Sequence, residues 1–306
     1  SKNDGVMEAF FGVAGVNRNK LVYNYGDQFR GDINLDSLGN VYVGSVSQSI
    51  DFPTVNAFQS TFGGVLDGVA FKLTNDLSTI EWSTFIGGDS LDAVYGILRD
   101  SENNLFVTGG TNSNNFPTTS GVLNETRIGE VDGFLSRIDN TGDSLLASTL
   151  LGTNEYDQSY FVQLDTADNA YVLGQTNGGY QVVNSNYVEP NGGLFIHKIT
   201  PGLDSTFYST TIGTNWRDSY NVTRPNISPT AFLVNECENV FLSGWGGGTN
   251  GVSRYLDYRS STFEQVNYNV ITVSTIFGAQ VDIPVPTRSM YTSPFAYKRE
   301  DQTDGS

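Results

Sequence analysis

One histidine and one cysteine limit the nucleophilic chemistry open to this chain of 306 residues. A Ser-His-Asp or Cys-His system would have to use His197, which stands inside a strand-like run. Cys237 lies between Glu236 and Glu238, whose negative charges oppose formation of a nucleophilic thiolate. We therefore expect His197 to be a variable strand residue and Cys237 a small packing residue at a turn. We predict no catalytic and no cofactor-binding residue.

Paired carboxylates offer a second kind of chemistry, because glycosidases need an acid together with a base or nucleophile. The candidates are Asp51, Asp67, Asp89, Asp92, Asp132, Asp157 and Asp218. Most of them recur at equivalent places in an internal repeat, which indicates turns and strand starts. A catalytic pair should depart from the repeat rather than follow it. A carbohydrate-active hydrolase is therefore the alternative function and not the preferred one.

Loops rich in Asp, Asn and Gly also offer the oxygen ligands that calcium takes. No loop fits the EF-hand or the nonapeptide calcium pattern. The run Asp139-Asn140-Thr141-Gly142-Asp143 is typical of a hairpin turn. We expect no cofactor, with calcium left open and the metal ligands unknown.

The charge balance excludes whole classes of partner. The chain has 16 Lys and Arg against 33 Asp and Glu, a net charge of −17, so no basic stripe is present to bind nucleic acid or an anionic membrane surface. No apolar run is long enough to span a bilayer. A single cysteine excludes a disulfide within the chain. No leader pattern follows Ser1, so we expect any signal peptide to have been removed.

The chain repeats itself, and the repeat gives the fold class. A short strand anchored by Asn recurs at intervals of 64, 65 and 70 residues, at Asn40, Asn104, Asn169 and Asn239. A second strand opens at Asp67, Asp132 and Gly193, and a third at Trp82, Ala147 and Tyr208. Four short antiparallel strands in a unit of about 60 residues are typical of a propeller blade. We predict an all-β propeller of four-stranded antiparallel blades.

The predicted propeller fills residues 1–306 as an incomplete ring, with blade units at 4–66, 67–131, 132–192 and 193–306. Asp4-Gly5 matches Asp67-Gly68, so we expect the chain to open inside a blade and to be a fragment of a longer protein. Residues 255–286 exceed the repeat and are predicted to be an inserted hairpin. This hairpin either contacts a partner or covers an open blade edge. The expected contact residues are Tyr255, Tyr258, Phe263, Tyr268, Ile276 and Phe277.

These motifs resemble the SBBP (seven-bladed β-propeller) repeat family. The resemblance rests on Asn40-Val41-Tyr42-Val43-Gly44, Asp51-Phe52-Pro53-Thr54 and Trp82-Ser83-Thr84-Phe85-Ile86-Gly87-Gly88. A second copy has Asn115-Phe116-Pro117-Thr118, whereas the third has Gly179-Tyr180-Gln181 in its place. The run from Cys237 to Gly247 is similar to a variant in large secreted gliding-motility-associated or surface proteins of Bacteroidota. That resemblance implies export by type IX secretion.

A three-residue pattern recurs in which Asp is followed by Ser or Thr and then by a small or aliphatic residue. This pattern is similar to the O-glycosylation signal of exported proteins of Bacteroidota. It places candidate glycans on Ser37, Ser90, Ser144, Thr166 and Ser205. Asp-Ser is also ordinary turn chemistry, so both interpretations stay open.

Together these observations predict a non-catalytic propeller, secreted or on the outer face of a Gram-negative cell. It would act as a binding or adhesion module within a larger surface or gliding-motility-associated protein. The expected partners are a protein or carbohydrate at the cell surface, the secretion machinery, and the remaining blades of the same polypeptide. The alternatives are the hydrolase and an inert spacer in a surface fibre.

Overall fold

The computed structural model describes residues 31–185, 187–190, 192–213, 215–217, 223–225, 227–246, 275–281 and 291–292. These residues form strands joined by turns and loops, and no helix occurs among them. They make four sheets of four strands and one two-stranded ribbon. The structure confirms the predicted all-β fold of four-stranded antiparallel blades.

We call each four-stranded sheet a blade and number the blades along the chain. Blade one contains β1 (Asp32–Leu35), β2 (Val41–Ser47), β3 (Asp67–Leu73) and β4 (Ile80–Ile86). Blade two contains β5 (Asp92–Arg99), β6 (Leu105–Thr111), β7 (Asp132–Ile138) and β8 (Leu145–Leu151). Blade three contains β9 (Asp157–Leu164), β10 (Ala170–Thr176), β11 (Leu194–Ile199) and β12 (Thr206–Ile212). The ribbon of β13 (Asn215–Arg217) and β14 (Thr223–Pro225) precedes blade four, which contains β15 (Ile227–Val234), β16 (Val240–Gly246), β17 (Thr275–Val281) and β18 (Tyr291–Thr292).

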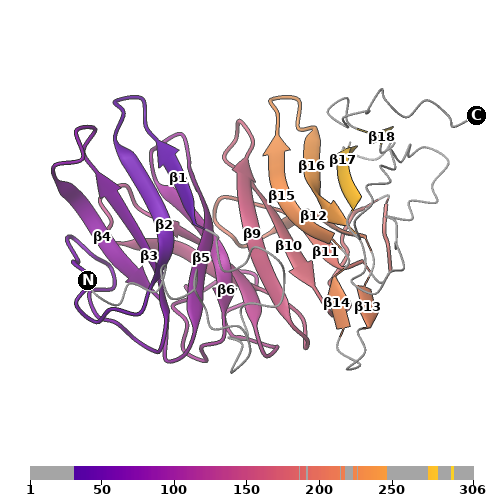
Figure 1. Ribbon diagram of the computed structural model, residues 1–306, viewed down its shortest axis with the longest axis horizontal. Helices are drawn as coiled ribbons and strands as arrows, with labels where there is room; N and C mark the ends of the chain where they lie inside the picture. Colours follow the sequence, from indigo (N-terminus) through magenta and orange to yellow (C-terminus); the bar gives the residue numbers. More distant parts are fainter. Residues whose placement is uncertain are drawn as a thin grey trace, which may run out of the picture.

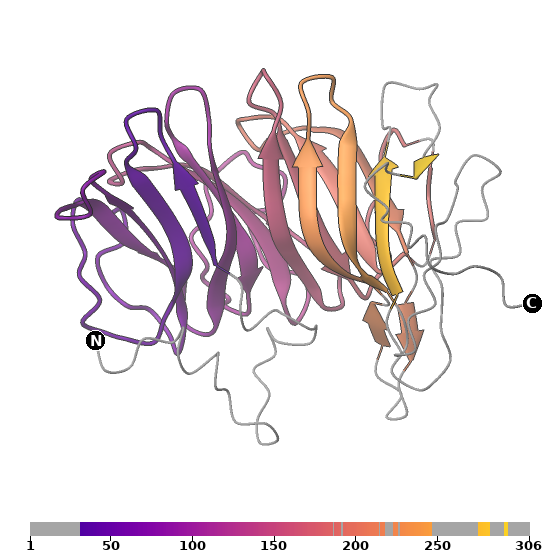
Figure 2. The same cartoon turned by 45° about the horizontal axis from the view of Figure 1, so that its top comes forward.

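The blades stack face to face in an open row (Figures 1 and 2). The strand order within every blade follows the chain. The first strands of successive blades contact one another, β1 with β5, β5 with β9, and β9 with β15. These first strands therefore lie on the inner side of the row. No described sheet closes into a barrel, and the arrangement is that of an incomplete propeller.

One aromatic ring from each Asn-anchored strand occupies the same position in its blade. The register shows this equivalence, because each ring opposes the corresponding residue of the next strand. The pairs are Tyr42 with Lys72, Phe106 with Arg137, Tyr171 with Lys198, and Phe241 with Gln280. The first three rings are fully buried and pack against the following blade, whereas Phe241 is half-buried. Strands aligned on their Asn anchors therefore occupy equivalent positions in the four blades.

The blade boundaries differ from the predicted units. The units 67–131 and 132–192 begin at Asp67 and Asp132, yet both residues lie inside a sheet, where they pair with Ser47 and Thr111. The sheets span 32–86, 92–151, 157–212 and 227–292. The predicted unit 67–131 thus combines the last two strands of blade one with the first two strands of blade two. A repeat fixes the period of the blades, whereas hydrogen bonding between strands fixes where each blade starts.

Blade four corrects the predicted insertion. Ile276 and Phe277 belong to β17, which pairs along the whole of β16 and takes the place of β3 in blade one. This part of 255–286 is therefore a strand that the repeat requires. Tyr255, Tyr258, Phe263 and Tyr268 lie outside the described residues. The extra length of blade four falls at 247–274, between β16 and β17. Alternating residues predict a strand but not the sheet that it joins.

The loops between the second and third strands cover the outer edges of the first three blades. Val55 and Ser83 exchange backbone hydrogen bonds of 3.1 and 2.8 Å, so the loop pairs with the outer strand β4. The Ser148 hydroxyl donates to the Pro117 carbonyl at 2.7 Å in blade two. The Ser209 hydroxyl donates to the Gln181 carbonyl at 2.6 Å in blade three. The Phe-Pro-Thr loops and the Ser-Thr pairs thus protect exposed strand edges from further pairing.

Candidate functional site

The turns that join the first and second strands gather polar side chains at one end of the blades. Asp100 accepts hydrogen bonds at Oδ1 from the backbone N–H groups of Glu102 (2.9 Å) and Asn104 (2.8 Å). The Asn104 amide donates to Asp100 Oδ2 at 3.0 Å. Asp36 with Asn40 and Asp165 with Asn169 make the same contacts. The recurring Asn therefore closes a turn around the Asp four residues before it.

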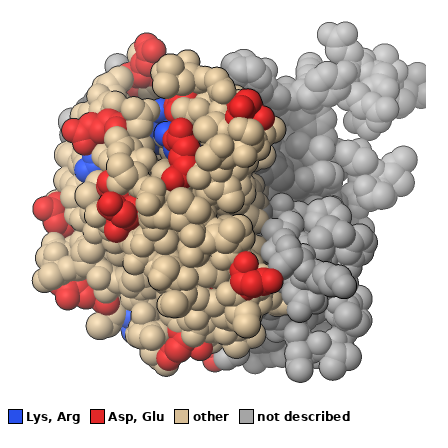
Figure 3. Space-filling model, turned by 90° about the vertical axis from the view of Figure 1, so that its left-hand side faces the viewer, with Lys and Arg blue, Asp and Glu red and all other residues tan. Residues whose placement is uncertain are grey.

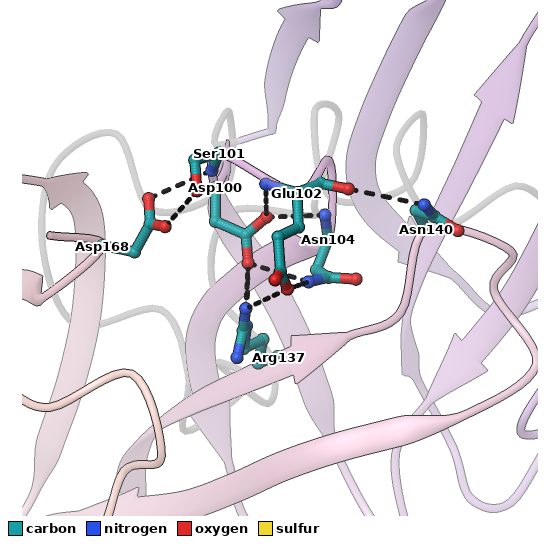
Figure 4. Close-up of polar contacts among 7 residues, drawn as sticks. All are labelled: Asp100, Ser101, Glu102, Asn104, Arg137, Asn140 and Asp168. Carbon is teal, nitrogen blue, oxygen red and sulfur yellow. Dashed lines mark hydrogen bonds and ion pairs between the residues drawn. The ribbon is translucent and has the colours of Figure 1, made fainter. Parts of the chain in front are cut away.

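A cation and an aromatic ring complete this arrangement in three blades, and Figure 4 shows the contact between the cation and the acid in blade two. In blade two, Arg137 Nε donates to Asp100 Oδ2 at 2.8 Å, and the guanidinium lies 5.6 Å from the centroid of the Phe106 ring. In blade one, the Lys72 ammonium lies 3.9 Å from Asp36 and 5.2 Å from the centroid of the Tyr42 ring. In blade three, the Lys198 ammonium lies 2.8 Å from Asp165 and 4.8 Å from the centroid of the Tyr171 ring. We call each set of acid, cation and ring a turn triad.

The turn triads are charged structural supports. Burial raises the pKa of Asp165, but hydrogen bonds from Lys198, Asn169 and the backbone outweigh burial and hold the pKa below its ordinary value. In blade four the corresponding residues are Asn235 and Gln280, so the acid and the cation are lost together. An unpaired buried charge is costly, which explains why the two positions change as a unit.

The same turns connect neighbouring blades. Asp168 of blade three accepts hydrogen bonds from the Ser101 backbone N–H (3.1 Å) and hydroxyl (2.6 Å) of blade two (Figure 4). Glu238 of blade four accepts from Lys198 (2.8 Å) and from the Tyr171 hydroxyl (3.0 Å) of blade three. Asp168 and Glu238 occupy the same turn position, with φ of 59° and 61°. The sequence alone did not predict these contacts. Lys198, a charged residue within an otherwise largely apolar strand, is a local signal for the contact with Glu238, whereas no local signal links Asp168 to Ser101.

A second set of acidic residues lies at the opposite end of the blades. Asp67, Asp92, Asp132 and Asp157 each begin a strand, and each is fully buried. Burial is the main cause that raises the pKa of Asp67 to about 6 and that of Asp157 to about 7. Burial also raises the pKa of Asp92 and Asp132. None of these four side chains is exposed to solvent.

The remaining candidate carboxylates lie apart from this set. Asp51 is exposed and accepts a hydrogen bond from the Ser49 hydroxyl, which lowers its pKa. Asp89 is exposed and accepts from the Asn114 backbone at 3.1 Å. Asp218 lies outside the described residues. In the Asp139–Asp143 run, Asp139 accepts from the Thr141 hydroxyl and the Ser144 backbone, as a hairpin turn requires. Among the described side chains, no group of three His, Cys, Asp or Glu could hold a metal ion.

His197 is a buried strand residue, as expected. It lies on β11, where Nδ1 is 2.9 Å from the Tyr180 hydroxyl and Nε2 is 2.8 Å from the Thr206 hydroxyl. Burial lowers the pKa of His197 to about 3, so the ring is neutral at physiological pH. Both ring nitrogens are therefore engaged. Cys237 lies in a turn, as expected, but its side chain is exposed rather than packed.

The candidate glycosylation residues divide between the two ends of the blades. Ser37, Ser144, Thr166 and Ser205 are exposed on turns at the end that carries the turn triads. Ser90 lies at the opposite end, is half-buried, and donates to Asn112 Oδ1 at 3.0 Å. The structure thus brings four of the five positions to one end.

Comparison with known proteins agrees with the architecture. Residues 81–117 match the SBBP family, a β-propeller repeat. The matched stretch begins in β4, includes β5 and β6, and reaches the Phe-Pro-Thr loop of blade two. No curated protein matches the chain. In the described residues, no helix has the length and apolar character needed to cross a membrane.

Proposed function

We propose that this chain is a non-catalytic propeller module, secreted or displayed on the cell surface, that binds a protein or a carbohydrate through the turns at one end of its blades. The observation that carries the proposal is that each turn between the first and second strands has the same frame residues, whereas the residues between them differ from blade to blade. The frame residues, Asp or Asn at the start and Asn at the end, hold every turn in the same way. The residues between them are Ser37-Leu38-Gly39, Ser101-Glu102-Asn103, Thr166-Ala167-Asp168 and Glu236-Cys237-Glu238.

Repetition with local variation is how propellers and other repeat proteins acquire binding specificity on a common scaffold. Because the frame keeps each turn rigid, the turns would lose little conformational entropy when a partner binds. The variable residues include a carboxylate in the turns of blades two, three and four. Each turn therefore presents a different surface at a fixed position.

The charge distribution supports a neutral or basic partner. The five Lys and Arg side chains of blades one to three are already engaged: Lys72 with Glu81, Arg99 with Asn34, Arg127 with Asn114, Arg137 with Asp100, and Lys198 with Asp165. On the face that Figure 3 shows, acidic side chains are numerous and basic ones are few. A sugar or a basic protein surface fits this field, whereas a nucleic acid does not.

The exposed face of blade one supports the proposal that further blades of the same polypeptide are among the partners. Ile33 is 66% exposed, whereas its equivalents Ile97, Val162 and Phe232 are 2%, 3% and 6% exposed. Those three equivalents pack against the preceding blade. We also propose that the chain is part of a larger surface or gliding-motility-associated protein that is exported by type IX secretion. This proposal rests on the similarity of residues 237–247 to such proteins.

Binding measurements on matched variants test the proposed turn surface. The test variant combines Leu38→Ser and Ala167→Ser, which change exposed turn residues whose side chains make no hydrogen bond to the frame. The control combines Val65→Ser, Ile128→Ser and Val188→Ser, exposed residues in the loops at the opposite end. The full chain and both variants are applied to a glycan array and to a panel of basic and neutral surface proteins. We expect a ligand of the wild type to be lost by the test variant and kept by the control, with equal melting temperatures. Binding by none of the three, or equal loss in both variants, contradicts the proposal.

A further inference from the structure

Two of the junctions between blades contain a pair of buried aspartates. At the first junction, Asp67 begins β3 of blade one and Asp92 begins β5 of blade two. A Cβ atom placed on Gly87 would lie 2.8 Å from Asp67 Oδ1 and 2.9 Å from Asp92 Oδ2. The two carboxyl groups therefore approach the same point from neighbouring blades.

The second junction repeats the arrangement one blade later. Asp132 begins β7 of blade two, and Asp157 begins β9 of blade three. A Cβ atom on Gly152, the equivalent of Gly87, would lie 2.6 Å from Asp132 Oδ1. Asp132 pairs with Thr111 as Asp67 pairs with Ser47, and Asp157 pairs with Thr176 as Asp92 pairs with Thr111. The charge of the other aspartate is a minor cause that raises the pKa of Asp67 and of Asp157. The pairs Asp67–Asp92 and Asp132–Asp157 are thus equivalent.

Hydrogen-bond donors reach mainly one oxygen of each carboxyl group. Asp67 Oδ2 accepts from the Gly63 backbone at 2.7 Å. Asp92 Oδ2 accepts from the Gly88 backbone and the Ser113 hydroxyl, both at 2.7 Å. Their Oδ1 atoms, which are buried, have no hydrogen-bond partner. A buried ionised oxygen without a donor is costly, and a proton on one member of the pair removes that cost.

The second pair follows the same pattern with one difference. Asp157 Oδ2 accepts from the Thr153 backbone (2.6 Å) and hydroxyl (2.7 Å), while Asp157 Oδ1 has no partner. Both oxygens of Asp132 accept from backbone groups, those of Ile128 and Gly129. Asp132 is therefore better suited to carry the negative charge, and Asp157 to carry the proton.

The members of a pair are present or absent together. At the third junction the two positions are Gly193 and Ile227. The chain has therefore replaced both carboxyl groups and has not left one of them alone. This joint loss indicates that the two groups of a pair act as a unit, and it supplies a junction without the pair as an internal control.

We propose that each pair retains one shared proton up to near-neutral pH and that its loss places two like charges across the junction, which loosens the contact between the blades. The propeller would then be most tightly joined along its first three blades in mildly acidic surroundings. The junction between blades three and four would not respond, because it has no carboxyl pair.

The other titratable groups around the pairs do not remove the effect. Burial is the main cause of the raised pKa of Asp92, and the charge of Asp89 adds to it. Burial also raises the pKa of Asp132, which Arg127 partly offsets. The Tyr180 phenol, which interacts with Asp132 and Asp157, has a pKa well above the ordinary value and stays neutral.

The sign of the pH dependence follows from proton binding. The raised pKa values, about 6 for Asp67 and about 7 for Asp157, mean that the folded chain binds protons that the unfolded chain has released. The contribution of the pairs to stability is full below the ordinary aspartate pKa of about 4 and falls as pH rises toward 7. His197 acts with the opposite sign in part of this range, so site-specific measurements are needed.

Carboxyl NMR of the full chain labelled with ¹³C-aspartate tests the proposal directly. We expect one titration step per pair at least about two units above the ordinary aspartate value of about 3.9. Asp67→Asn and Asp132→Asn should each shift the step at their own junction to lower pH, because the like charge is lost while the remaining carboxyl group stays buried. Asp89→Asn, an exposed change near the first pair, should leave both steps in place.

Hydrogen exchange provides the functional readout and does not depend on the variants. Between about pH 5.5 and about pH 7.5, protection corrected for intrinsic rates should fall in β3, β5, β7 and β9 and stay constant in β15. Four aspartates that all titrate below about pH 5 would overturn the proposal. A calcium-dependent rise in melting temperature that Asp67→Asn and Asp132→Asn abolish would also overturn it, because the pairs would then be cation sites.

Discussion

Arg137 and Asp100 form a largely buried ion pair whose two positions become Gln280 and Asn235 in blade four. Arg137 is a strand residue of β7, and Asp100 starts the turn that precedes β6. The side chain of Asp100 is fully buried, and that of Arg137 is 18% exposed. The chain itself thus contains both a charged and a neutral version of one structural contact.

This relationship predicts strong coupling between the two residues. Asp100→Asn alone should destabilise the chain by about 3–5 kcal/mol, because it removes the buried carboxylate from the Arg137 guanidinium and leaves only the exposed Glu102 at 3.3 Å. The double variant Asp100→Asn with Arg137→Gln copies blade four and should cost less than the single change. Urea unfolding of the two single variants and the double variant measures the coupling. Additive effects of the two changes would contradict it.

The buried rings of the Asn-anchored strands should differ in their contribution to stability. Phe106→Ala should cost about 3–5 kcal/mol, because the Phe106 ring is fully buried between blades two and three. Phe241→Ala should cost less, since that ring is half-buried. Thermal unfolding of both variants, with the exposed Leu38→Ala as control, makes the comparison. Equal losses at Phe106 and Leu38 would show that the junction does not depend on the ring.

His197 predicts a loss of stability in acid. Its folded pKa of about 3 lies below the ordinary value, so the folded state excludes a proton that the unfolded state binds. The stabilising contribution is full above about pH 6.5 and falls by about 1.4 kcal/mol for each pH unit below it, until the folded pKa is reached. His197→Gln, which keeps hydrogen-bonding groups beside Tyr180 and Thr206, should flatten this slope. An unchanged slope in the variant would assign the acid sensitivity to other groups.

The Ser-Thr pairs on the outer strands should hold the loops that cover the blade edges. Thr149 accepts a hydrogen bond from the Asn124 backbone at 2.9 Å, beside the contact between Ser148 and Pro117. Ser148→Val with Thr149→Val should cost about 1–3 kcal/mol for each buried group left unpaired and should free the loop 112–131 for cleavage. Limited proteolysis followed by mass spectrometry detects that cleavage. The exposed Ser144→Val is the control, and equal cleavage of both variants would refute the role in edge protection.

Glycans, if the native host adds them, should occur at one end of the blades. Ser37, Ser144, Thr166 and Ser205 are exposed on turns, whereas Ser90 is half-buried and hydrogen-bonded. We expect modified peptides at the first four positions and an unmodified peptide at Ser90. Intact mass and glycopeptide mapping of protein from the native host make the measurement. A mass equal to that of the bare polypeptide would remove the prediction.

The sequence by itself determined the fold class, the repeat and the register of the Asn-anchored strands. These features depend on local chemistry. The Asp and Asn of each turn are four residues apart and bond to each other and to the backbone between them, so a short window of sequence contains the whole unit. The same locality explains why the neighbours of His197 in the sequence are enough to assign it to a strand.

Only the tertiary structure decided where each blade begins, which part of residues 255–286 joins a sheet, and which acidic residues meet. Asp67 and Asp92 come together across a blade junction, and Ser101 reaches Asp168 over a separation of 67 residues. No local pattern specifies such contacts, because they depend on how one sheet packs on the next. A repeat predicts equivalent positions within blades, whereas packing between blades determines which of those positions become buried, paired and shifted in pKa.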